Sequence, residues 1–273
     1  MKFLKKKYQL IKVKSILTRK IPKQTLLIAF LIIAPLLVDA QEEKNVQAYL
    51  VHEDRVKPGM VQVYEQVAKD LVAACTEHNI QELNWMTVSQ DDNTYLYITP
   101  MEKFAELDVN NFSLLADKMG KEKMTALFDR FNPCYDEHGD YVIYLHKDLS
   151  YQPGGVNPNP EGKYFRKFMY DYVTPSNEKD YLEVLKEIKE MFIDKNSKLN
   201  YRIYSTGFGT IGKYYLIVIE GESPLQLETL AAENWKMMGE DFQPVFNNIR
   251  AKIEKTDEKT GWMRADLSYF PKK

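Results

Sequence analysis

The chain has 273 residues, of which 44% are hydrophobic, and its 37 basic and 39 acidic residues give a formal charge of −2. A chain of this length can bury a sizeable core, as one large or two small domains. Residues 41–273 hold 28 of the basic and 38 of the acidic residues. So acidic a segment has no electrostatic basis for binding phosphate groups, which argues against nucleic acids and anionic lipid surfaces as partners.

Residues 1–40 have the pattern of a signal peptide. Nine basic residues precede an apolar run over residues 26–38, and small residues flank the expected cleavage point after Ala40. The run contains Pro35 and is shorter than the roughly 20 apolar residues that cross a bilayer. We therefore expect export to the periplasm or the exterior, with no stable membrane insertion after cleavage. An uncleaved N-terminal membrane anchor is the alternative.

Residues 46–151 predict a β-α-β-β-α-β module, the ferredoxin-like order. Alternating apolar residues indicate strands, and apolar residues at steps of three and four indicate helices. The expected elements are a strand at 46–53, a turn at Lys57-Pro58-Gly59, a helix at 60–79, strands at 83–90 and 94–99, a helical stretch from 101 to 132 and a strand at 140–148. A break of the helical stretch near 108–111 is the alternative to one continuous helix.

Residues 152–162 contain three prolines and three glycines and predict a linker. Residues 163–273 then predict a second module of the same order. Its expected elements are a strand at 164–172, a helix that carries Tyr181, Leu185, Ile188 and Phe192 on one face, strands at 201–207 and 213–220, a long helix from 224 to about 255 and a strand at 261–269.

Two short phrases recur at nearly the same spacing. Asp-Leu-Ser-Tyr stands at 148–151 and again at 266–269, a shift of 118, and Met-Gly stands at 119–120 and 238–239, a shift of 119. A single-residue loop insertion accounts for the difference between the shifts. The sequence therefore predicts a tandem duplication of one ferredoxin-like module.

A β-α-β-β-α-β module that opens with a strand, followed by Lys57-Pro58-Gly59 and an amphipathic helix, resembles the dimeric α/β-barrel superfamily, and the turn is similar to that of NIPSNAP-like members. The resemblance covers residues 46–271. It implies an α+β fold in which two four-stranded antiparallel sheets face each other as a barrel within one chain. That superfamily includes quinol and haem-degrading monooxygenases, peroxidases, chlorite-decomposing enzymes and proteins without known activity, so the resemblance transfers no catalytic residue.

Strand alternation separates two faces of each sheet. The apolar set of the first module includes Tyr49, Val51, Leu96 and Ile143, and we expect it to receive the helices. We expect the opposite, aromatic and polar set to line the barrel, where each buried Arg would need a carboxylate, water or an anionic ligand. The candidate ligand-binding residues are His52, Trp85, Tyr97, His146, Arg166, Tyr170, Trp262 and Arg264.

We expect neither a metal site nor a cofactor. His52-Glu53-Asp54 lacks the spacing that puts two histidines on one helix face, and His78, His138 and His146 stand alone. Haem held by His52 or His146 as the single axial ligand is the alternative. Cys75 and Cys134 are expected to remain unpaired.

The leading hypothesis is an exported, non-catalytic protein that binds a small aromatic or acidic organic molecule in the barrel. The first alternative is a cofactor-independent monooxygenase-like enzyme, with His52 or His146 as base, or a haem-handling enzyme. The second is a structural or interaction module of the cell envelope. Since one module would cover the sheet of the other, we expect a monomer or a weak oligomer.

Overall fold

Eight antiparallel strands close into one barrel in the part of the chain that the computed structural model describes, residues 45–210 and 212–272. The expected signal peptide lies outside the described residues. The order around the barrel is β1-β3-β2-β8-β5-β7-β6-β4. The strands are β1 (Val46–Val56), β2 (Met86–Gln90), β3 (Thr94–Met101), β4 (Tyr135–Tyr151), β5 (Phe165–Val173), β6 (Tyr201–Thr206), β7 (Tyr214–Gly221) and β8 (Ile253–Met263).

Each half of the chain contributes a four-stranded sheet with the same order of strands. The first half supplies β4-β1-β3-β2 and the second half supplies β8-β5-β7-β6. The pairs β2–β8 and β4–β6 join the two sheets and close the barrel. The expected α+β fold with facing antiparallel sheets is therefore observed, as a dimeric α/β barrel within one chain.

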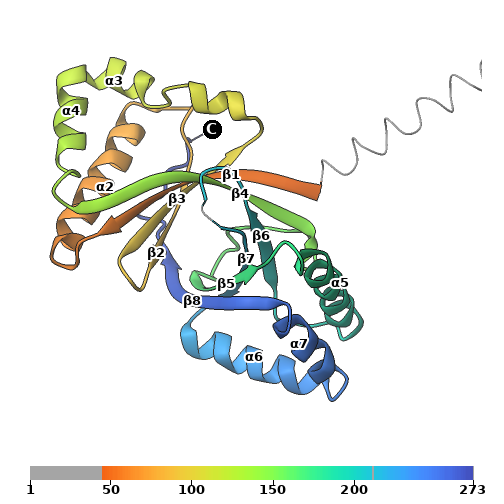
Figure 1. Ribbon diagram of the computed structural model, residues 1–273. Helices are drawn as coiled ribbons and strands as arrows, with labels where there is room; N and C mark the ends of the chain where they lie inside the picture. Colours follow the sequence, from red (N-terminus) through yellow and green to blue (C-terminus); the bar gives the residue numbers. More distant parts are fainter. Residues whose placement is uncertain (1–44, 211, 273) are drawn as a thin grey trace, which may run out of the picture. The chain divides into compact units, whose positions relative to one another are not determined.

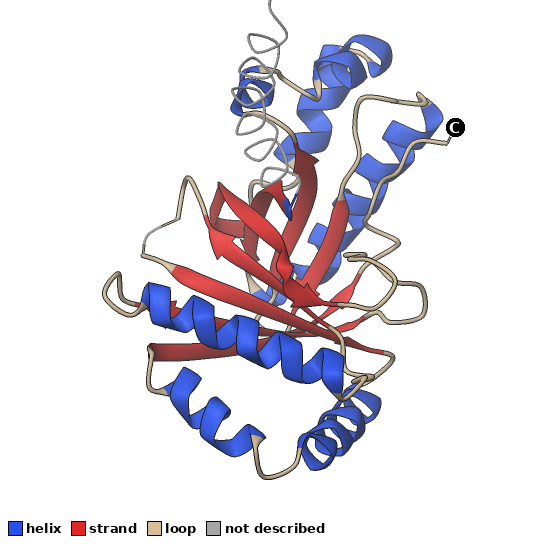
Figure 2. Cartoon of the chain, turned by 90° about the vertical axis from the view of Figure 1, so that its right-hand side faces the viewer, coloured by secondary structure: helices blue, strands red, loops and turns tan. Residues whose placement is uncertain are grey.

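Two groups of helices cover the outside of the barrel (Figures 1 and 2). One group packs on the first-half sheet and the other on the second-half sheet. Among the described residues, none of the helices is both long and apolar enough to cross a membrane. The helices are η2 (Pro58–Met60), α2 (Val61–Glu77), η3 (Phe104–Asp108), α3 (Ser113–Met119), α4 (Lys121–Asp129), α5 (Glu178–Asp194), α6 (Pro224–Met238) and α7 (Phe242–Arg250).

A glycine divides each of the two long helices that the sequence predicts. Gly120 separates α3 from α4 with φ +95°, and Gly239 separates α6 from α7 with φ +77°. A residue with a side chain rarely adopts such a backbone conformation, whereas glycine does so at little cost. The apolar spacing continues across both glycines, and for that reason the pattern alone predicts one helix in each place.

The last strand lies earlier in the chain than the sequence predicts. β8 covers Ile253–Met263, and the expected strand at 261–269 is wrong except for its first residues. Its first half is charged and largely exposed, which resembles the end of a helix in sequence. Pairing with β5 along most of its length makes it a strand, so long-range contacts override the local pattern.

The two Asp-Leu-Ser-Tyr segments, at 148–151 and 266–269, each pack against the opposite half of the chain. Leu149 and Tyr151, at the end of the first half, pack in the core under α5–α7. Leu267 and Tyr269, at the end of the second half, pack in the core under α2–α4, where Tyr269 pairs with Trp85 across an isolated bridge. Each half-core is therefore completed by residues from the other half of the chain.

We expect Leu267→Ala to lower the free energy of unfolding by about 2–5 kcal/mol, because its side chain is fully buried and truncation leaves a cavity. Phe270→Ala is the matched control, since Phe270 is 54% exposed and should change stability by no more than about 0.5 kcal/mol. Urea unfolding measures both variants. Equal, small losses would show that the C-terminal segment does not belong to the first-half core.

Candidate functional site

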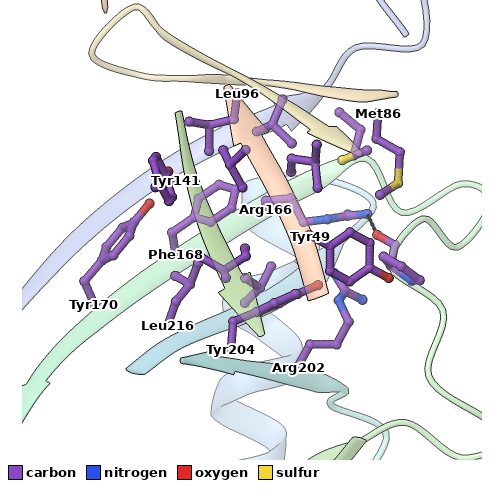
Figure 3. A pocket seen from close by; sticks show the side chains of 17 residues that line it. Tyr49, Met86, Leu96, Tyr141, Arg166, Phe168, Tyr170, Arg202, Tyr204 and Leu216 are labelled. Carbon is purple, nitrogen blue, oxygen red and sulfur yellow. Dashed lines mark hydrogen bonds between the residues drawn. The ribbon is translucent and has the colours of Figure 1, made fainter. Parts of the chain in front are cut away.

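The barrel interior is a nearly filled apolar core. Figure 3 shows the side chains that converge there, with Arg166 and Arg202 beside Tyr49 and with Tyr141 and Tyr170 at the other side. The remaining cavity measures about 50 Å³. A cavity that holds benzene in a protein core is about 150 Å³. The interior therefore cannot take an aromatic ligand unless its lining moves.

Both interior arginines find partners within the protein. Arg202 forms a fully buried ion pair with Glu220. Arg166 donates to the carbonyl oxygens of Lys163 and Pro158, so it fastens the linker across one end of the barrel. Burial, with the neighbouring charge of Arg202, lowers the pKa of Arg166 to about 10. Arg202 is thus paired with a carboxylate, although its Nε has no hydrogen-bond partner among the described residues, whereas Arg166 is held by carbonyl oxygens instead of a carboxylate.

Six of the eight candidate residues lie on the outside of the barrel, contrary to the sequence prediction. Arg166 and Tyr170 are inside, as expected. The apolar set that was expected under the helices, including Tyr49 and Val51, fills the interior instead. The prediction of which first-half side chains face the interior is therefore wrong. It is also wrong for β8, where Met263 faces the interior and Trp262 faces outward. The residues on the outer face are His52, Trp85, Tyr97, His146, Trp262 and Arg264.

Three of these outer residues do not join a common site. Arg264 forms ion pairs with Glu65 of α2 and with Asp266. His146 places Nε2 2.8 Å from Ser205 Oγ. Trp262 is 43% exposed. Arg264 thus links the segment after β8 to α2, and His146 links β4 to β6.

His52, Trp85 and Tyr97 do come together, in a cavity of about 360 Å³ between the first-half sheet and helices α2–α4. We call this cavity the helix-side pocket. Its walls are mainly aromatic, and its volume is within the range of small-molecule sites. The aromatic lining residues are Trp85, Tyr97, Phe112, Phe128, Phe131 and Tyr135.

His52, Asp54 and Asp140 line one end of the helix-side pocket and form, together with the adjacent His138, a block of four polar residues on two paired strands. His52 lies opposite Asp140, and Asp54 lies opposite His138, in the β1–β4 ladder. Residues two apart on a strand share a face, so all four side chains point outward together. His52 Nδ1 is 2.9 Å from Asp140 Oδ1, and His52 Nε2 is 3.1 Å from Asp54 Oδ1.

A buried tyrosine continues this polar network beneath the helices. Tyr64 of α2 donates its hydroxyl hydrogen to Asp54 Oδ2 at 2.5 Å, and its oxygen is 2.8 Å from the hydroxyl of Tyr97. Asp54 is 4% exposed and Tyr64 is fully buried. Burial, Tyr97 and Asp54 all raise the pKa of Tyr64, so it remains a neutral donor.

His52 carries a positive charge at neutral pH. Burial lowers the pKa of its imidazole, but hydrogen bonds with Asp140 and Asp54 outweigh that effect and raise the pKa to about 10. The geometry agrees, since each ring nitrogen faces a carboxylate oxygen and must donate to it. The same hydrogen bond from His52 lowers the pKa of Asp140. The expected role of His52 as a base at neutral pH therefore does not fit this arrangement.

The corresponding position in the second half has the aspartate and tyrosine without the histidines. Tyr181 of α5 donates to Asp171 at 2.9 Å, as Tyr64 does to Asp54. The ladder partners there are Met169 opposite Glu258 and Asp171 opposite Thr256. Met169 thus replaces His52, and Thr256 replaces His138. The buried Asp–Tyr pair is common to both halves, whereas the histidines belong to the first half alone.

The signal for this site is present in the sequence as two His-x-Asp triplets, at 52–54 and 138–140. On a helix, the His and Asp of each triplet would not share a face, so neither triplet would form a metal or catalytic site there. On two antiparallel strands in register, the triplets form one four-residue block. His138 stands alone in the sequence, and only the register of β1 against β4 brings it next to Asp54.

No protein-family model and no curated protein sequence matches the chain. Similar solved structures include a "putative monooxygenase" from Lactobacillus acidophilus NCFM (TM-score 0.50, 10% identity, 83% of this chain and 97% of that chain). An anthrone oxidase-like protein has a TM-score of 0.51 and 13% identity, over 80% of this chain and 91% of that chain. A second "putative monooxygenase", from Fusobacterium nucleatum, has a TM-score of 0.50 and 13% identity, over 80% of this chain and 92% of that chain.

The shared architecture decides the fold. The chain has the dimeric α/β-barrel fold. At these identities the likeness extends to the fold alone. The dimeric α/β barrel of this chain is closed by its own two halves, and the helix-side pocket lies outside it.

The pKa of His52 predicts a pH dependence of stability. The folded-state pKa of about 10 exceeds the ordinary value of 6.5, so the stabilisation is complete below pH 6.5 and is lost as the pH rises towards 10. We expect the free energy of unfolding to fall less over this range in His52→Gln than in the wild type, with EDTA present.

His146→Gln is the control, because burial lowers the pKa of His146, so this histidine gains no stability from being charged in the folded state. It should retain the wild-type slope. Identical slopes for wild type and His52→Gln between pH 6.5 and 10 would contradict the assignment of a charged His52.

Proposed function

We propose that the protein binds an uncharged, hydroxylated aromatic compound in the helix-side pocket and oxidises it with O2. One observation carries the proposal: a cavity of about 360 Å³ has aromatic walls and ends at a hydrogen-bonded group of His52, Asp54, Tyr97 and Asp140. Flat aromatic ligands pack well against such walls, and a few polar groups fix their orientation.

The charges of the pocket favour a phenol over an organic acid. Glu82, Asp54 and Asp140 all line it, against the single imidazolium of His52. A carboxylate ligand would meet this excess of negative charge, whereas a phenolic hydroxyl would donate to one of the carboxylates. Of the two ligand classes that the sequence suggests, aromatic or acidic, the aromatic one fits this pocket.

The proposed reaction converts an activated methylene group of the substrate into a carbonyl group with one oxygen atom of O2. For a methylene group flanked by hydroxylated rings, O2 gives a carbonyl and one water, and the substrate supplies all four electrons. The carboxylates of Asp54 and Asp140 would accept the hydroxyl hydrogen and increase the electron density of the ring. The aromatic walls would exclude bulk water. The fold supports this reading, since two of the similar structures carry the name monooxygenase and one is named anthrone oxidase-like.

Haem fits poorly at this end of the pocket. Both ring nitrogens of His52 face carboxylates, so an axial bond to haem iron would have to break one of these contacts. His146 does not line the helix-side pocket or the cavity under α5–α7. We therefore propose that the reaction does not use haem.

We also infer that the two halves arose by tandem duplication from a NIPSNAP-like module. Matching contacts support this. Ser150 donates to the carbonyl of His146 and accepts from the amide of Ile203, and Ser268 does the same with Arg264 and Thr87. Export as a monomer or weak oligomer remains our proposal from the sequence.

Filling the helix-side pocket should abolish both binding and oxidation. Thr99 lines this pocket, and Ile219 occupies the corresponding ladder position beneath α5–α7. We expect Thr99→Phe to weaken binding of 1,8-dihydroxyanthrone at least tenfold, because its ring would occupy the ligand volume, while Ile219→Phe binds normally. Tryptophan fluorescence measures binding, and an oxygen electrode measures turnover above the uncatalysed rate.

Binding without O2 consumption would contradict the oxidase proposal and leave a non-catalytic binding protein. Equal affinity of Thr99→Phe and the wild type would show that the ligand lies elsewhere. Circular dichroism of both variants establishes that they fold.

A further inference from the structure

We propose that His52, Asp54 and His138 bind a divalent transition-metal cation at the polar end of the helix-side pocket. His52 Nε2 is 3.1 Å from Asp54 Oδ1, and His138 Nδ1 is 4.0 Å from the same oxygen. All three donor atoms lie within 4.8 Å of one another. Donor atoms around a tetrahedral cation with bonds of about 2.0–2.1 Å are about 3.3 Å apart, so a small movement of the side chains closes the site.

The two strands hold the donors in place. His52 and Asp54 stand two residues apart on β1, and His138 lies directly opposite Asp54 on β4. His138 has a side chain that is 54% exposed, and its ring centroid already lies 5.6 Å from that of His52 and 4.9 Å from that of Tyr135. The backbone therefore already has the spacing of the site, and only one outer side chain has to adjust.

Each inner ligand has a second partner that would orient it. Asp140 accepts from Nδ1 of His52 at 2.9 Å, which leaves Nε2 for a cation. Tyr64 donates to Oδ2 of Asp54 at 2.5 Å, which leaves Oδ1. A carboxylate on the remote nitrogen of a ligating histidine and a donor on the remote oxygen of a ligating carboxylate are the usual supports of metal ligands. A cation between Nε2 and Oδ1 would replace the proton there and keep both residues as ligands.

The second half shows that the histidines are not needed to hold the buried aspartate. Asp171 is satisfied by Tyr181 and by Thr256, whose hydroxyl donates at 2.7 Å. Met169, two residues before Asp171 on the same face of β5, stands where His52 stands in the first half. A purely structural role for Asp54 would be met in the same way, so the two histidines in the first half point to a different role.

The donor set selects the class of cation. Two imidazoles and one carboxylate suit Zn²⁺, Fe²⁺, Co²⁺ or Mn²⁺, and this set leaves coordination positions open. His52 and Asp54 line the helix-side pocket, so an open position would face it. If the proposed function is correct, the hydroxyl oxygen of the substrate would occupy that position and lose its proton more readily. Only this last step rests on the proposed function.

Cobalt binding tests the site directly. We expect tag-free, EDTA-treated full-length protein to bind one equivalent of Co²⁺, with visible absorption bands and a matching calorimetric titration. His138→Ala should weaken Co²⁺ and Zn²⁺ binding at least tenfold, and Asp140→Asn should weaken it about 10–100-fold through the lost support of His52. His146→Ala removes a histidine outside the group and should bind like the wild type.

The proposal is overturned if the wild type shows no saturable one-site binding, or if His138→Ala binds as tightly as the wild type. His138 is exposed, so its substitution should not unfold the chain, and circular dichroism checks this. Thermal unfolding with and without Zn²⁺ gives a second readout, since a bound cation raises the melting temperature of the wild type more than that of His138→Ala. Because no organic substrate is present, failure of the oxidation leaves these results unchanged.

Discussion

The closed barrel of eight strands constrains everything else in this protein. A barrel of that size has an interior just wide enough for its own side chains. Apolar residues from all eight strands fill it, with one buried Arg–Glu pair and Arg166 at the linker end. In the part of the chain that the structure describes, the barrel interior therefore has no room for a ligand, whereas the helix-side pocket has room because the helices stand away from the sheet there. The aromatic and polar face of β1 and β3 lies on the helix side of the sheet, because the apolar face of these strands fills the barrel interior.

The succession of strands and helices along most of the chain could be predicted from the sequence, because apolar periodicity is local, but the start of β8 and the breaks in the two long helices could not. The direction of each face could not. Both faces of β3 are rich in large side chains, Tyr95 and Tyr97 on one and Leu96 and Ile98 on the other. Tyrosines under helices look like interior residues until the hydroxyl partners, such as Glu65 for Tyr95, are known.

The candidate site was predicted in part for the same reason. His52, Trp85 and Tyr97 were expected inside the barrel and instead meet in the helix-side pocket, where their partners come from α2 and from β4. Neither helix packing nor strand register can be predicted from one sequence. The two His-x-Asp triplets are 86 residues apart in the sequence. Only the β1–β4 ladder turns them into neighbours. Conversely, Arg264 and Trp262 were misplaced because β8 begins earlier than its apolar residues suggest.

The crossing of the closing segments also makes the two halves of the chain depend on each other. Leu267 and Tyr269 complete the core of the first half, and Trp85 Nε1 donates to the carbonyl oxygen of Leu267, 182 residues further along the chain. The core that surrounds the helix-side pocket therefore forms only when both halves are folded together. Removal of residues 265–272 would keep every ligand of the proposed metal site but take away the packing that holds it, so the site depends on a segment that supplies none of its ligands.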